Sequence, residues 1–278
     1  FLTRSKVMPH DIEAPLPELL RAAARQYPQH PAVITGEQAL VFADLDAMSD
    51  RVAAGLAAKG VTKGDRVGLY CPNCAEFAVA YTGILKAGAV VVPVNLLYSP
   101  SEVAFMLQDA EAKCLIYHGA FHGLADCLRK SAPSLQRFVA IDDQADPDSW
   151  VSLLNNSEPL PAPQFDSRED VAVILYTSGT TGQPKGAMLT HRNLAANTAS
   201  VRLALDWRAG EDVVLLVLPM FHAFAATVGM LTPLLCGCAF VPLARFEPDA
   251  VAKTIVAAKA TIFLGVPSMY SVLLRLKD

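Results

Sequence analysis

The residues best suited to chemistry lie in one segment near the middle of the chain, residues 176–186, with the sequence YTSGTTGQPKG. The segment follows the apolar run 171–175, which predicts a buried strand. Glycine lets backbone N–H groups approach an anion closely, while hydroxyl groups and a lysine add donors and positive charge. This combination suits a polyphosphate. The alternative is a surface turn, but an ordinary turn rarely joins a buried strand to four hydroxyls and a lysine.

Two familiar nucleotide-binding motifs do not fit this segment. The Walker loop requires a glycine, four further residues, and then Gly-Lys-Ser or Gly-Lys-Thr. Here Lys185 stands three positions after Gly182, and Pro184 directly precedes the lysine. No Gly-x-Gly-x-x-Gly sequence opens a predicted helix either, so the sequence gives no support to a dinucleotide-binding fold.

Residues 176–186 closely resemble the signature loop of the adenylate-forming enzymes, which include acyl-CoA synthetases, aryl-CoA ligases, luciferases and peptide-synthetase adenylation domains. The sequence PMFHAF at 219–224 resembles a second core motif of that family, in which an aromatic–histidine pair faces the carboxylate substrate. VPSMY at 266–270 resembles a later strand-to-helix corner. The resemblance extends from about His30 to Leu276 and is closest to fatty or medium-chain acyl-CoA synthetases.

The resemblance implies a role for each of these segments. The residues that would bind the β- and γ-phosphates of ATP are Thr177, Ser178, Gly179, Thr180, Thr181, Gly182 and Lys185. Thr177 would also help to hold Mg²⁺, which prefers oxygen ligands shared with phosphate, and Lys185 would offset the charge of the departing pyrophosphate.

The resemblance also implies roles for two aromatic residues further along the chain. Phe221 and His222 would contact the substrate carboxylate, or His222 would separate the acyl and thioester positions. The alternative for His222 is a core histidine bonded to a backbone carbonyl. His191 would either cap the next helix or contact phosphate.

The reaction that the resemblance implies is the activation of a carboxylic acid. A carboxylate is a poor electrophile, and joining it to AMP turns one of its oxygens into a leaving group that a thiol can displace. The enzyme therefore has to position ATP and neutralise charge. The complete enzyme would convert a fatty acid, ATP and CoA into acyl-CoA, AMP and pyrophosphate. The alternatives are a peptide-synthetase adenylation domain and a non-catalytic nucleotide-binding or interaction fragment.

Members of this family are much longer than 278 residues. The sequence lacks the Tyr-Gly-x-Thr-Glu motif, whose glutamate holds magnesium, and the later aspartate that binds the ribose. The small C-terminal domain with its catalytic lysine is also absent. We therefore expect the chain to be the N-terminal half of a synthetase and to be inactive alone. Because members of the family are often dimers, a homodimer is a further expectation.

The composition is that of an ordinary soluble enzyme. A net charge of -4 and scattered basic residues predict no general attraction to nucleic acid or to anionic membranes. Residues 213–244 contain no Asp, Glu, Lys or Arg, but Pro219, Pro233 and Pro242 interrupt this run. It therefore predicts a buried strand–helix–strand unit, with the helix at 223–235, and no transmembrane segment. With no secretory leader visible, we expect a cytoplasmic enzyme.

Two pairs among the six cysteines have spacings that metal sites use. Cys71 and Cys74 are three positions apart, and Cys236 and Cys238 are two apart. A structural zinc site needs four ligands, which usually come as two such pairs. Since these pairs fall at the ends of predicted strands and helices, free and largely buried thiols in a reducing compartment are expected instead.

Apolar runs alternate with helical patterns from Ala32 onward, which predicts an α/β fold of mostly parallel sheets flanked by helices. By resemblance, this would be an incomplete N-terminal domain of an adenylate-forming enzyme. A segment rich in Asp, Pro, Ser and Asn, 143–170, would connect an α/β lobe at 1–142 to a second lobe at 171–278. The second lobe carries the phosphate-binding segment. If its C-terminal end is truncated, an unpaired sheet edge or an apolar face should be exposed there.

Overall fold

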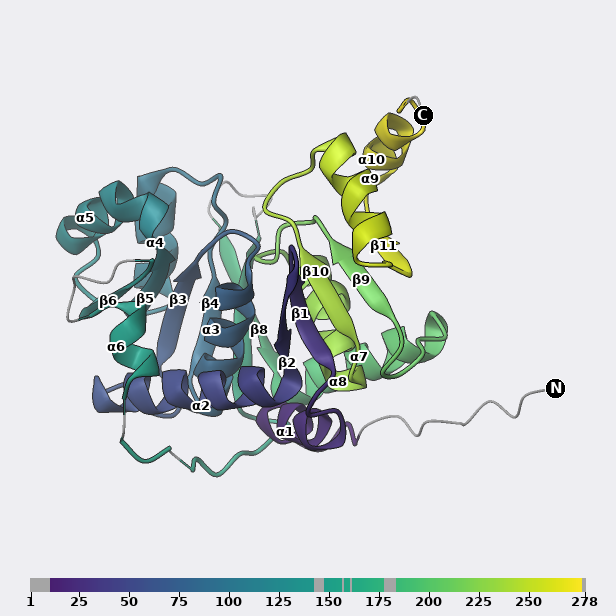
Figure 1. The fold of residues 1–278 in the computed structure, drawn as a ribbon. Coiled ribbons are helices and arrows are strands. Elements are labelled where there is room, and N and C mark those ends of the chain that lie inside the picture. The colour runs from purple at the N-terminus through teal and green to yellow at the C-terminus, as the bar shows by residue number, and fades with distance from the viewer. Residues whose placement is uncertain (1–10, 143–147, 157, 161, 178–183, 277–278) are drawn as a thin grey trace.

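The computed structural model describes residues 11–142, 148–156, 158–160, 162–177 and 184–276. Within these ranges the strands form a six-stranded sheet and a five-stranded sheet, with helices between and around them (Figure 1). Most neighbouring strands in both sheets run parallel. The α/β fold that the sequence predicts, with mostly parallel sheets flanked by helices, is confirmed.

The six-stranded sheet has the strand order β6-β5-β3-β4-β7-β8. Its strands are β3 (Arg66–Tyr70), β4 (Val90–Pro93), β5 (Ala112–His118), β6 (Arg137–Ile141), β7 (Val171–Thr177) and β8 (Lys185–Thr190). All of them run parallel except β8, which pairs antiparallel with β7 at one edge of the sheet. Since parallel strands end at the same edge of a sheet, the carboxyl ends of β3, β4 and β7 lie together, where open α/β sheets bind ligands.

The five-stranded sheet has the order β11-β9-β10-β1-β2. Its strands are β1 (Pro31–Thr35), β2 (Gln38–Val41), β9 (Val213–Leu216), β10 (Ala239–Pro242) and β11 (Ile262–Leu264). Only β2 runs antiparallel to its neighbour. Each sheet thus contains strands from both sides of the segment 143–170, so the division into sheets does not follow a division of the chain at that segment.

The main hydrophobic core lies between the two sheets. Helix α3 (Ala75–Lys86) occupies this space, and nearly all of its residues are buried (Figure 1). Phe77 of α3 shares one apolar cluster with Val67 of β3 and with Leu216 of β9. Removing this apolar surface from water is the main force that holds the sheets together. The other helices are α1 (Leu16–Gln26), α2 (Phe42–Ala58), α4 (Pro100–Asp109), α5 (His122–Ser131), α6 (Trp150–Leu154), α7 (His191–Ala204), α8 (Thr232–Cys236), α9 (Pro248–Ala257) and α10 (Pro267–Leu273).

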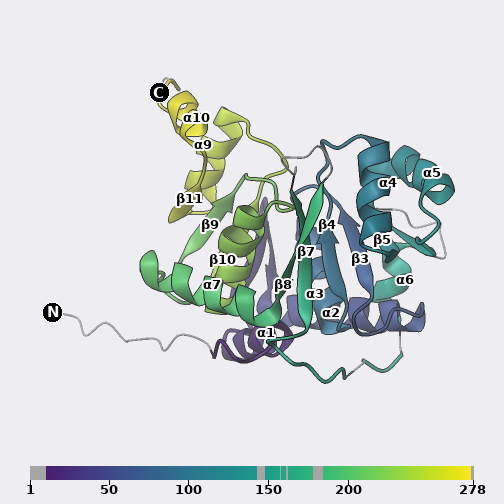
Figure 2. The ribbon, with the colours of Figure 1, turned by 180° about the vertical axis from the view of Figure 1, so that it is seen from behind.

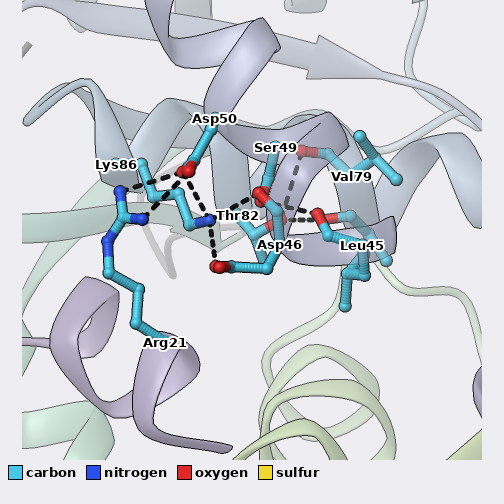
Figure 3. Close-up of polar contacts among 9 residues, drawn as sticks. Arg21, Leu45, Asp46, Ser49, Asp50, Val79, Thr82 and Lys86 are labelled. Carbon is cyan, nitrogen blue, oxygen red and sulfur yellow. Dashed lines mark hydrogen bonds and ion pairs between the residues drawn. The ribbon is translucent and has the colours of Figure 1, made fainter. Parts of the chain in front are cut away.

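A buried lysine fixes the far end of α3 to its neighbours. The Lys86 side chain is 1% exposed, and its Nζ lies 2.5 Å from Asp46 Oδ1 and 2.7 Å from Asp50 Oδ1, both on α2. Arg21 of α1 binds the same Asp50 carboxylate at 2.9 Å, so Asp50 lies between the two cations (Figure 3). A buried lysine is tolerated when it is paired in this way, and the network ties α1, α2 and α3 into one unit.

The C-terminal part of the described chain shows two departures from simple packing. The helix predicted at 223–235 is present, but its middle part is a π-helix, η2 (Ala225–Leu231), which α8 continues. Helix α10 buries none of its residues and exposes Tyr270 and Val272, beside the edge strand β11. Apolar side chains are therefore exposed on this helix. None of the helices in the described ranges combines the length and apolar character that crossing a bilayer requires.

Candidate active site

The predicted phosphate-binding segment joins two strands of the six-stranded sheet. Thr177 ends β7 and Lys185 begins β8, and these two residues pair across the antiparallel ladder. Figure 2 shows β7 and β8 at the front of the molecule, between α7 and α4. Residues 178–183 of the segment lie outside the described ranges, and they include the predicted phosphate-binding residues Ser178, Gly179, Thr180, Thr181 and Gly182. The structure therefore gives the base of the segment, which lies at the edge where β3 and β4 also end.

Thr177 and Lys185 are both exposed at the base of the segment. Among the acidic side chains that the structure describes, none forms an ion pair with Lys185. An ammonium group on a flexible stem, without a carboxylate partner, can move to meet an anion. The hydroxyl of Thr177 adds a donor and an oxygen ligand on the opposite strand.

The strands below this base are held in place by the residue before Thr177. Tyr176 lies opposite Gly186, and its hydroxyl donates a 2.6 Å hydrogen bond to Oδ2 of Asp109 at the end of α4. A Cβ on Gly186 would lie 2.8 Å from Ile174 Cγ2 and 3.1 Å from Tyr176 Cζ, so only glycine leaves room for the ring. Burial and the bond to Asp109 raise the pKa of Tyr176, which keeps the phenol protonated as the donor.

Phe221 and His222 follow the carboxyl end of β9, as predicted. Their rings lie 4.6 Å apart, with Phe221 buried and His222 exposed. A turn places the histidine, because its backbone N–H donates to Pro219 O at 3.0 Å and its carbonyl accepts from Ala226 at 2.9 Å. Partial burial lowers the pKa of His222, so the imidazole is neutral at pH 7 and can donate one N–H. An exposed ring does not fit the alternative of a core histidine.

The π-helix η2 begins three residues after His222, and the sequence pattern did not predict it. Its geometry is supported by Thr232, whose hydroxyl donates to Thr227 O at 2.8 Å. Gly229 packs directly on Leu216 of β9, and a Cβ at this glycine would overlap the leucine side chain. π-helical turns are rare and often adjoin functional sites. Here the turn lies between the His222 segment and the core.

Asn73, which sequence reasoning missed, joins the edges of the two sheets. It lies in the turn after β3, and its Nδ2 donates to Leu218 O at 2.9 Å and to Leu243 O at 3.0 Å. Its Oδ1 accepts from the backbone N–H of Met220 at 2.7 Å. These contacts place the carboxyl end of β3 beside the residues that follow β9 and β10. The structure therefore places Thr177 and Lys185 at the same side of the molecule as His222.

His191 has a structural role instead of either predicted one. The helix that it begins, α7, is capped by Thr190, whose hydroxyl accepts from the backbone N–H of Asn193. The His191 ring is buried, packs edge-on against Phe165 at 5.0 Å, and accepts a 3.3 Å hydrogen bond at Nδ1 from Leu16. Burial lowers the pKa of His191 to about 4, so the ring stays neutral. Its partner is 175 residues away, beyond the reach of local sequence patterns.

The cysteines are free thiols, as expected. Cys71 and Cys74 lie with their sulfur atoms 3.4 Å apart, and Cys236 and Cys238 are both buried. Within the described ranges, no group of three or more His, Cys, Asp or Glu side chains could hold a metal ion. The paired cysteine spacings therefore do not mark a zinc site in this part of the chain.

A cavity of about 460 Å³ lies along β7 and β8, away from the histidine. Its walls include Tyr176, Gly186 and Asp109, while neither Phe221 nor His222 lines it. It therefore borders the strands that carry the phosphate-binding segment without reaching the place predicted for the carboxylate substrate.

Comparison with known families and sequences gives consistent matches. The sequence model of a family described as AMP-binding enzyme matches residues 20–278. The chain is 30% identical to a long-chain-fatty-acid–CoA ligase of Bacillus subtilis (strain 168), over 96% of this chain and 53% of the relative. It is 36% identical to a feruloyl-CoA synthase of an Amycolatopsis species, over 89% of this chain and 48% of the relative.

Solved structures show the same relationship. A long-chain-fatty-acid–CoA ligase from Archaeoglobus fulgidus superposes with a TM-score of 0.86 at 29% identity, covering 94% of this chain and 53% of the neighbour. The chain thus spans about half the length of the relatives that it matches. The part that it covers includes both sheets, the strands that carry Thr177 and Lys185, and the turn that carries His222.

Proposed function

The chain belongs to the AMP-binding enzyme family, and on this premise we propose that it forms the ATP-binding part of an acyl-CoA synthetase. Such an acid–thiol ligase joins a carboxylic acid to AMP, releases pyrophosphate, and then transfers the acyl group to the thiol of CoA. The observation that carries the proposal is the arrangement of Thr177 and Lys185 at the base of one hairpin, on the side of the molecule where His222 is exposed.

In the first step, the carboxylate attacks the α-phosphorus of ATP and pyrophosphate leaves. The leaving group gains negative charge, so donors and cations held around the β- and γ-phosphates lower the barrier. Lys185 is proposed to supply one such charge, and the exposed Thr177 hydroxyl another donor. The other proposed phosphate-binding residues are Ser178, Gly179, Thr180, Thr181 and Gly182.

Mg²⁺ is a proposed cofactor, and the described residues fit it in one respect. Thr177 offers a hydroxyl oxygen, a ligand type that Mg²⁺ takes together with phosphate oxygens. No cluster of three acidic, histidine or cysteine side chains within the described ranges could hold the ion alone. Thr177 would therefore share the ion with the phosphates of ATP, where it would neutralise charge on the departing pyrophosphate.

Phe221 and His222 are proposed to receive the carboxylic acid. The lowered pKa of His222 leaves a neutral ring, which can donate one N–H to a carboxylate oxygen without a strong ion pair that would weaken the nucleophile. The buried Phe221 ring at 4.6 Å limits how the imidazole can turn. A fatty acid is the proposed substrate, since several relatives are named long-chain-fatty-acid–CoA ligases, although two are named feruloyl-CoA synthase.

The proposal also covers the setting of the enzyme. CoA is the second substrate, the free thiols suit a reducing cytoplasm, and a homodimer is proposed from the family resemblance. We infer that the 278-residue chain alone completes neither step, because its sequence lacks the Tyr-Gly-x-Thr-Glu motif.

The test is carboxylate-dependent exchange of pyrophosphate into ATP, measured with the complete enzyme that contains this chain. Lys185→Ala should slow the exchange at least about tenfold, because the charge on pyrophosphate is no longer offset. The matched control is Lys253→Ala, which removes another exposed lysine, on α9, and should leave the rate unchanged. An unchanged rate in Lys185→Ala, or exchange that requires no acid, would contradict the proposed function.

A further inference from the structure

We propose that Asn73 is a positioning residue for the carboxylate site: its side-chain amide fixes the segment 218–222, and through it His222, against the end of β3. This inference rests on the proposed function. Asn73 touches neither His222 nor the phosphate-binding segment, so its effect would pass through the backbone that it holds.

The contacts of Asn73 use its amide fully. The residue is 6% exposed, its two N–H groups point at Leu218 O and Leu243 O, and its oxygen receives the N–H of Met220. The carbonyl of Leu216 lies at 3.5 Å, too far for a third strong bond. Turning the amide over would set its oxygen against two carbonyl oxygens, so the surrounding groups fix its orientation.

The position of these bonds explains why they control the segment. Leu218 and Met220 flank Pro219, so the amide binds a carbonyl and an N–H two residues apart, as a neighbouring strand would. Pro219 in turn accepts the N–H of His222 at 3.0 Å. Successive hydrogen bonds therefore connect Asn73 to the backbone of His222. They fix residues 218–222, which follow β9 and, within the described ranges, have no strand partner of their own.

The anchor itself is rigid. Asn73 lies between β3 and α3, two elements that are buried in the main core, and the preceding Pro72 restricts the backbone. The neighbouring Cys71 and Cys74 thiols are 3.4 Å apart and pack on the same core. Because the strand that leads to Thr177 belongs to the same sheet as β3, Asn73 sets the carboxylate site relative to the ATP site. A displacement of about 1 Å between reacting groups can cost on the order of a hundredfold in rate.

The experiment is a double-mutant cycle in the complete enzyme, measured by acid-dependent pyrophosphate exchange. Asn73→Ser, which keeps a small polar group, should lower kcat/KM for the acid at least about tenfold and change KM for ATP less than about twofold. In the His222→Ala background, the same substitution should have less than about a threefold effect, since the group that it positions is gone. Asn73→Ala should behave alike, with a larger loss.

A control and a second measurement separate positioning from general damage. Thr82→Ala removes another buried hydrogen bond of α3, from Thr82 Oγ1 to Ala78 O at 2.7 Å, without touching the segment, and should leave both KM values unchanged. The NMR titration of the His222 imidazole should shift in Asn73→Ser but not in Thr82→Ala. Equal effects of Asn73→Ser with and without His222, or an unshifted titration, would overturn the inference. If the unmodified enzyme shows no acid-dependent exchange at all, the proposed function itself fails.

Discussion

Thr177 and Lys185 face each other across the β7–β8 ladder, each at the point where its strand meets the phosphate-binding segment. The backbone pairing thereby places a residue with a hydroxyl opposite a residue with an ammonium group, while the lysine stem stays free to move. The next pair down the ladder is Tyr176 and Gly186, and it determines how firmly that base is held. The first prediction concerns this pair.

Gly186→Ala should displace the Tyr176 ring. The new Cβ would lie 2.8 Å from Ile174 Cγ2 and 3.1 Å from Tyr176 Cζ, so the ring must move and its bond to Asp109 must weaken. We expect a loss of about 1–3 kcal/mol in the free energy of unfolding and slower adenylation. Urea unfolding checks this, with Gly123→Ala as the control because that glycine has open space around it. Equal stability of the two variants would show that the close packing at Gly186 is not needed.

Stability should depend on pH through His191. Burial lowers the pKa of this ring from 6.5 to about 4, so the unfolded chain binds more protons than the folded chain between these values. The stabilisation is complete above pH 6.5 and is lost as the pH falls toward 4, by up to about 3 kcal/mol. His191→Asn, which keeps an acceptor for the N–H of Leu16, should flatten this dependence, while His30→Gln on the surface should not. Parallel pH profiles for all three proteins would contradict the prediction.

Lys86→Met should destabilise the fold. The substitution leaves the Asp46 and Asp50 carboxylates, each about a quarter exposed, without their shared cation. We expect a loss of about 2–3 kcal/mol, at or below the lower end for breaking a buried ion pair, because Arg21 still binds Asp50. Thermal or urea unfolding measures the loss, and Lys130→Met on the exposed surface of α5 is the matched control. A stable Lys86→Met variant would mean that apolar packing replaces the network at no cost.

The cysteines should react with iodoacetamide in a definite order. Burial raises the pKa of Cys114 and of Cys236 to about 12, and the thiolate is the reactive form. Cys127 is exposed and should be labelled first at pH 8. Peptide mass spectrometry of the native protein measures the order, and the same reaction in urea should label all of them equally. Early labelling of Cys114 would show that the sheet around it opens more readily than its packing indicates.

The strands and the motif segments were predictable because their signals are local. The apolar run before Thr177 and the proline-aromatic-histidine sequence each mark a strand end, and both strands are present, although β9 ends at Leu216, before the predicted Leu218. What the sequence concealed depends on contacts between distant residues. In the sequence, Asn73 looks like an ordinary turn residue, because its hydrogen-bond partners Leu218 and Met220 lie far along the chain. His191 likewise accepts its hydrogen bond from Leu16, which is 175 residues away.

The π-helix was missed for a different reason. Its residues, Ala225–Leu231, are apolar and suit an ordinary α-helix equally well. The wider turn depends on Thr232 reaching the carbonyl of Thr227 and on Gly229 fitting against Leu216.

The interleaving of the two sheets has a consequence for synthesis. Val33 of β1 pairs with Phe240 of β10, so the five-stranded sheet cannot close until most of the chain has left the ribosome. Until then, β1 and β2 form a two-stranded ribbon, which is marginally stable alone. Pairings so distant in sequence slow folding and prolong the exposure of unpaired strand edges. The β1–β2 hairpin is thus made long before the strand β10 that completes its sheet, and a nascent chain stalled before β10 should bind chaperones.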